Sequence, residues 1–121
     1  MGHLATADAS GVPHVVPVCF AFVDGEFWIP IDEKPKTTAR LTRLRNVEAN
    51  SRVSLVFDHY EEDWSKLAYL LVRGNGEILD SPPEAAVTAW RARYEQYAAM
   101  RLEGRPAIKI TPTSVSAWGD L

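Results

Sequence analysis

The feature that most constrains this chain is an apolar run over residues 13–23, followed at once by Asp24-Gly25 and a second run over residues 26–31. Asp-Gly between two such runs predicts a two-residue β-hairpin. Both faces of the first run are apolar, whereas an exposed antiparallel strand would alternate with polar side chains. We therefore expect one face to fill a barrel interior and the other to meet a ligand or a second subunit. Pro17 and Pro30 lack an N–H for the ladder and indicate an edge or an irregularity.

Four further segments have the composition of strands, which brings the expected number of strands to six. They lie at residues 4–7, 52–60, 67–79 and 107–118. Gly74-Asn75-Gly76 predicts a bulge in the third of them, and Pro112 predicts a kink in the last. All of these strands are compatible with antiparallel pairing.

Two segments have helical spacing instead. Between residues 37 and 50 the apolar side chains recur every three positions, with Thr37 or Thr38 as the expected N-cap. The second helix is expected to begin at a capping box on Ser81 and to end near Met100. Six strands and two helices predict a mainly β (α+β) fold, a small closed or split antiparallel β-barrel.

Size and composition limit the possible functions. The chain has 121 residues, which predicts a single domain over residues 1–121. Its net charge of −3 argues against a general nucleic-acid binder or a binder of anionic membranes. No apolar run approaches the ~20 residues of a membrane helix, and no signal peptide is recognised. Cys19 is the only cysteine, so we expect a reducing compartment, the cytoplasm.

The most informative polar segment is basic and stands in an otherwise acidic chain. Residues 34–45 contain no acid and five cations, Lys34, Lys36, Arg40, Arg43 and Arg45. Because Lys36 and Thr37 fall at the predicted helix start, free backbone N–H groups and lysines would together form an anion site suited to a phosphate. The alternative is a solvated basic face that pairs with nearby acids such as Glu48.

Other candidate site residues give weaker indications of a function. His59 stands among acids at residues 58–63, but no second histidine is near, so no metal site is predicted. Of the four tryptophans, Trp64 and Trp118 fall at strand or loop ends and are better placed than Trp28 and Trp90 to touch a ligand or partner. No arrangement of nucleophile, acid and base is recognised, so no catalytic side chain is assigned. The protein either binds without turnover or positions a cofactor that supplies the reaction.

Four segments, in this order and spacing, resemble the pyridoxamine-phosphate-oxidase-like, FMN-binding split-barrel superfamily. They are residues 11–22, the hairpin 24–31, Lys34-Pro35-Lys36-Thr37, and Arg45 to Asp58. Within that superfamily, residues 58–64 and 109–113 look most like a branch of deazaflavin-dependent oxidoreductases, which use coenzyme F-420 in place of FMN.

The resemblance implies a homodimer with cofactor clefts at the subunit interface. The ring would lie along Val16-Pro17-Val18 and Pro30-Ile31, and Lys34, Lys36 and Thr37 would hold the phosphate. From their charge, we expect Arg40 and Arg43 to reach the acidic glutamyl tail of F-420. Hydride would pass between the ring and a small-molecule substrate that the sequence does not identify.

Three alternatives stay open. One is an FMN-dependent oxidoreductase, although many FMN members carry an arginine where this chain has Val16. The second is a barrel that binds flavin, haem or a tetrapyrrole without turnover. The third is a structural dimer with a basic surface. Oxidation of pyridoxamine phosphate itself is not expected, because the C-terminal substrate-binding extension of the oxidase is not recognised.

Overall fold

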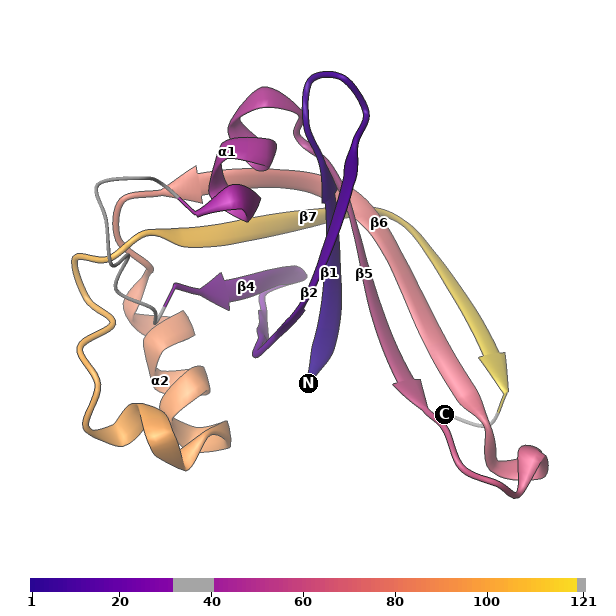
Figure 1. The fold of residues 1–121 in the computed structure, drawn as a ribbon. Helices are drawn as coiled ribbons and strands as arrows, with labels where there is room; N and C mark the ends of the chain where they lie inside the picture. The colour runs from indigo at the N-terminus through magenta and orange to yellow at the C-terminus, as the bar shows by residue number, and fades with distance from the viewer. Residues whose placement is uncertain (32–40, 120–121) are drawn as a thin grey trace.

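A computed structural model describes residues 1–31 and 41–119, and within them the chain forms one curled antiparallel sheet with two α-helices (Figure 1). The strands are β1 (Gly2–Ala7), β2 (Pro13–Val18), β3 (Ala21–Val23), β4 (Glu26–Pro30), β5 (Arg52–His59), β6 (Ala68–Leu79) and β7 (Ala107–Gly119). The α-helices are α1 (Thr42–Ala49) and α2 (Glu84–Arg93), and η1 (Trp64–Lys66) and η2 (Glu95–Ala98) are short 3-10 helices. The strand order is β2-β1-β5-β6-β7-β4-β3. The predicted mainly β split barrel is confirmed.

The strand expected over residues 13–23 is in fact two strands, so the described sheet has seven strands rather than six. β2 pairs with β1 at one edge of the sheet, and β3 pairs with β4 at the other. Cys19 and Phe20 alone link them, so the chain spans the two edges in three residue steps, at most about 11 Å. A flat sheet with this strand order would hold its two edges much farther apart than about 11 Å. The sheet therefore curls until its edges approach each other, and residues 13–23 supply one strand to each edge.

The predicted hairpin turn is present, and a bulge lies where one was predicted but on the neighbouring strand. Asp24 and Gly25 have φ angles of 52° and 80°, as a two-residue turn of the primed type requires. The register of β6 and β7 shifts between Arg73 and Gly74, which leaves Thr113 as the extra residue. The bulged residue therefore belongs to β7, while Gly74 provides the space: a Cβ there would lie 2.5 Å from the carbonyl oxygen of Thr111.

Both helices begin later than predicted. α1 begins at Thr42, and its N-cap residue is Leu41 in an extended conformation; the predicted caps Thr37 and Thr38 lie outside the described part of the chain. α2 begins after Pro83, and the predicted cap at Ser81 is wrong, because its hydroxyl accepts a hydrogen bond from the backbone N–H of Gly104.

The physical reason for the late start of α2 is the Pro82-Pro83 pair. A residue that precedes proline is driven out of the helical region. The helix therefore cannot begin until Pro83 has been passed. It also ends before the predicted Met100, because the backbone is extended at Tyr94.

Two apolar cores meet at β4. Phe27 and Ile29 join the core inside the curled sheet, which α1 covers, whereas Trp28 joins a second core under α2. The indole N–H of Trp90 donates to the carbonyl oxygen of Trp28 at 3.0 Å. Because β4 is buried on both faces, its sequence shows no apolar–polar alternation. Within residues 1–31 and 41–119, no helix has the length and apolar character that crossing a membrane requires.

Candidate functional site

Four of the predicted cofactor-binding residues line one small cleft. Pro17 and Val18 come from the end of β2, Pro30 from the end of β4, and Arg43 from the first turn of α1. The cleft has a volume of about 130 Å³, and Tyr97 also lines it. Since proline has no backbone N–H, Pro17 and Pro30 present apolar walls without unpaired donors. The guanidinium of Arg43 adds a positive charge.

The other predicted residues of this region lie elsewhere. Val16 is half-buried and packs on the core inside the sheet, and Ile31 is buried in that core. Lys34, Lys36, Thr37 and Arg40 lie outside the described residues. Residues 32–40 adjoin the cleft residues in sequence. On one side Ile31 follows Pro30, and on the other Leu41 precedes Arg43 by two positions.

A second and larger cleft lies on the exposed face of the sheet. Its volume is about 730 Å³, and its lining includes Val15, Val56, Tyr69 and Trp118. The rings of Tyr69 and Trp118 stack with centroids 6.1 Å apart and planes 17° from parallel. Trp118 thus joins an aromatic surface, whereas Trp64 lies in η1 and does not line this cleft. Trp28 and Trp90 are buried in the core under α2.

Tyr69 and Val15 were not predicted from the sequence as site residues, although both are large side chains at exposed positions of their strands. Tyr69 is directly opposite Trp118 on β7 and Asp58 on β5. The two-residue period of a strand, counted back from the polar residues Asn75 and Arg73, places Tyr69 on their face and was the available indication.

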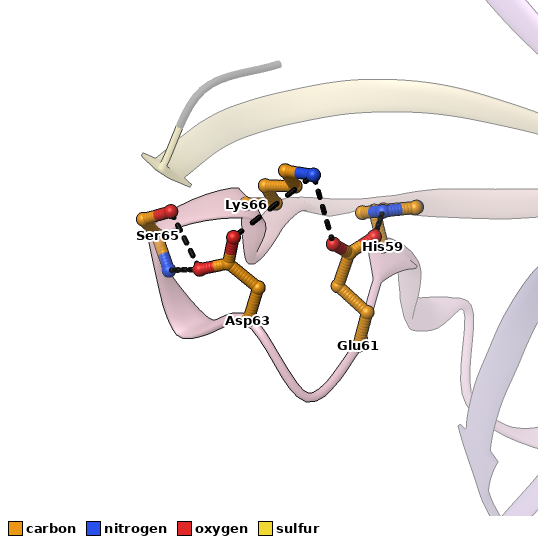
Figure 2. A network of polar contacts seen from close by, with 5 residues as sticks. All are labelled: His59, Glu61, Asp63, Ser65 and Lys66. Atoms are coloured by element: carbon orange, nitrogen blue, oxygen red, sulfur yellow. Dashed lines mark hydrogen bonds and ion pairs between the residues drawn. The ribbon is translucent and has the colours of Figure 1, made fainter.

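The acidic residues near His59 form a network at the tip of the β5–β6 hairpin (Figure 2). The imidazole Nε2 of His59 lies 2.6 Å from Glu61 Oε2, and Lys66 Nζ lies 3.8 Å and 3.9 Å from carboxylate oxygens of Glu61 and Asp63. Asp63 also accepts hydrogen bonds from the backbone N–H and the hydroxyl of Ser65. These carboxylates therefore bind their own hairpin. Across residues 1–31 and 41–119, no three His, Cys, Asp or Glu side chains are grouped to hold a metal ion.

The comparison with known protein families gives one match, which spans nearly the whole chain. A family model described as pyridoxamine 5′-phosphate oxidase matches residues 1–119. The chain belongs to this family. The resemblance to the flavin-binding split-barrel superfamily is confirmed. A search of curated proteins finds no match.

Solved structures with this fold come from proteins with different described roles. The conserved hypothetical protein Rv2991 from Mycobacterium tuberculosis is 23% identical, with a TM-score of 0.76 over 98% of this chain and 76% of its own. The haem storage protein HutZ from Vibrio cholerae is 16% identical, with a TM-score of 0.70 over 98% of this chain and 84% of its own. An F420 reductase is 25% identical, with a TM-score of 0.63 over 95% of this chain and 87% of its own.

Proposed function

We propose that this member of the pyridoxamine 5′-phosphate oxidase family is an oxidoreductase that binds coenzyme F-420 and acts on a small molecule. The observation that carries the proposal is the cleft of Pro17, Val18, Pro30 and Arg43. Apolar walls with one guanidinium fit a flat, largely apolar ring that carries an anionic arm. The F420 reductase of the same fold supports this choice of cofactor.

The residues of the chain bind and orient, and the deazaflavin supplies the hydride chemistry when it is bound. Pro17, Val18 and Pro30 present an apolar surface to the ring. Arg43 attracts the anionic arm, with Lys34, Lys36, Thr37 and Arg40 as the proposed phosphate and tail ligands of the neighbouring segment. A reducing, cytoplasmic setting belongs to the same proposal.

The size of the first cleft favours a homodimer. About 130 Å³ is below the roughly 300–1,000 Å³ of a site that encloses a small molecule. One subunit therefore provides only part of the surface that a cofactor needs. We place the second subunit on the exposed sheet face of Val15, Tyr69 and Trp118, where large apolar side chains meet solvent.

The proposal is tested by fluorescence titration of the purified protein with F-420 and, separately, with FMN. We expect F-420 to bind more tightly, and preference for FMN would assign the protein to the FMN-dependent alternative. Lys36→Glu should abolish binding and leave the fold intact, because it reverses a charge at the proposed phosphate site. Lys66→Glu makes the same charge change on the β5–β6 hairpin and should bind as the parent does. Unchanged binding by Lys36→Glu would show that the phosphate assignment is wrong.

A haem-binding role without turnover is the second candidate. The observation that favours it is the second cleft, whose rim carries His59 and Tyr60, side-chain types that can ligate haem iron. The haem storage protein of the same fold adds to this argument. Titration with haemin, followed by its visible absorbance, separates the two: saturable haemin binding with no binding of F-420 or FMN would replace the oxidoreductase proposal.

A further inference from the structure

We propose that a polar cleft at the Arg52–Asn75 end of the exposed sheet face, the far end of the β5–β6 pair from Tyr69, is a second oxyanion site, in which Arg52 and Arg73 hold a carboxylate or phosphate group of a small ligand. The cleft has a volume of about 570 Å³ and is lined by β1, β2, β5, β6 and β7. This proposal does not depend on the identity of the cofactor. It rests on the position, the charge and the isolation of the two arginines.

The strand register places the two arginines on neighbouring positions of one sheet face. On the β5–β6 pair, Arg52 is opposite Asn75 and Ser54 is opposite Arg73. Arg52 and Arg73 are therefore diagonal neighbours on one face of the sheet, at a separation that long side chains reach across. Both line the cleft, and so do the amide of Asn75 and the hydroxyl of Ser54.

Neither arginine has an anionic partner within the described residues. The residues that line the cleft include no Asp or Glu, and the side chains of Arg52 and Arg73 form no ion pair in the described part of the chain. Other arginines do have partners: Arg91 is 2.7 Å from Glu103, and Arg93 lies over the ring of Phe20. Two neighbouring guanidiniums repel each other unless an anion lies between them, and their forked N–H groups match the oxygens of carboxylate and phosphate.

The backbone around the arginines is fixed. Arg73 adjoins the bulge, where the hydroxyl of Thr113 donates to its carbonyl oxygen at 3.2 Å. Arg52 follows a turn in which its backbone N–H donates to the side chain of Asn50 at 3.1 Å. Because the backbone at both arginines is already ordered, anion binding has to order only their side chains.

This site is separate from the cleft of Pro17, Pro30 and Arg43. The polar cleft includes Ala7 and Pro13, which pair at one end of the β1–β2 hairpin, whereas Val18 pairs with Gly2 at the other end. Five residue steps along a strand span about 17 Å. An anion bound between Arg52 and Arg73 is therefore not the anion that Arg43 would attract.

The test is an NMR titration of the ¹⁵N-labelled full chain with citrate and, separately, with inorganic pyrophosphate at low ionic strength. We expect saturable shifts of the Ser54 and Asn75 amide signals with at least one probe. Arg52→Gln and Arg73→Gln should each weaken that binding by about tenfold or more, because each removes a charge-assisted contact. Both side chains are exposed, so both variants should keep the parent's unfolding temperature.

Arg101→Gln is the matched control, since it removes the same charge from an exposed arginine that does not line the cleft. It should bind both probes as the parent does. Tighter binding of citrate would indicate a carboxylate ligand, and tighter binding of pyrophosphate would indicate a phosphate ligand. Absence of saturable shifts with both probes would overturn the proposal, as would parental affinity in either cleft variant or an equal loss in Arg101→Gln.

Discussion

At the scale of single residues, one buried polar pair fixes α1 on the sheet. The amide Nδ2 of Asn46 donates to the hydroxyl of Thr6 on β1 at 3.0 Å, and both residues are buried. When a buried amide loses its hydrogen-bond acceptor, nothing offsets the free energy spent in removing the amide from water. This contact therefore matters more than its single hydrogen bond suggests.

Thr6→Val keeps the shape of the side chain and removes the acceptor. We expect the free energy of unfolding to fall by about 1–3 kcal/mol, measured by urea denaturation. Thr42→Val changes an exposed threonine of α1 and should alter stability by less than about 0.5 kcal/mol. Equal effects of the two substitutions would mean that the Asn46–Thr6 bond does not hold α1.

At the scale of elements, a lysine joins the three strands β4, β6 and β7. Lys109 Nζ lies 3.2 Å from Glu77 Oε2 and 3.6 Å from Glu26 Oε2. The hydrogen bond to Glu77, and then the charge of Glu26, raise the pKa of Lys109 above its ordinary value. Because the folded state holds the proton more tightly, this stabilisation is complete below the unfolded-state pKa of about 10.4. It is lost as the pH rises through the raised folded-state pKa.

Lys109→Met tests this dependence on pH. At about pH 8 the variant should unfold at a lower urea concentration than the parent, and by about pH 11 the difference should be smaller. Comparing the two proteins at each pH removes the contribution of the other lysines and tyrosines. A difference that stays constant between the two pH values would contradict the assigned pKa shift.

Elements determined by local chemistry were predictable from the sequence, and those determined by distant pairing were not. The Asp24-Gly25 turn follows from two residues that tolerate positive φ. The division of residues 13–23 does not, because it depends on which strands lie at the two edges of the sheet. The same holds for the sites: Pro17 was named from the family resemblance and Arg43 from its charge, whereas Arg52 and Arg73 become neighbours only through the register of β5 and β6.

In the molecule as a whole, the exposed sheet face carries large apolar side chains that meet solvent. β5, β6 and β7 extend beyond the curled part of the sheet as a long arm (Figure 1). Trp118 and Val15 are 52% and 60% exposed on the face that we assign to the second subunit. Burial of such side chains between two copies would supply most of the association energy.

Trp118→Glu should weaken the dimer by about thirtyfold or more, because a tryptophan at the centre of an interface contributes about 2 kcal/mol or more. Light scattering after size exclusion, over a dilution series, measures the change. Met100→Glu places the same charge on an exposed residue outside this face and should leave the dimer intact. A monomeric parent, or a Trp118→Glu variant that associates as the parent does, would contradict the assigned interface.

The two edge strands also bear on how the protein avoids aggregation. An open sheet with long, unprotected edges recruits strands from other molecules. Here β3 is three residues long, and Pro13 and Pro17 remove two N–H donors from β2. Neither edge is a good template for a further strand. The edges therefore favour the face-to-face pair that we propose over edge-to-edge growth into a fibre.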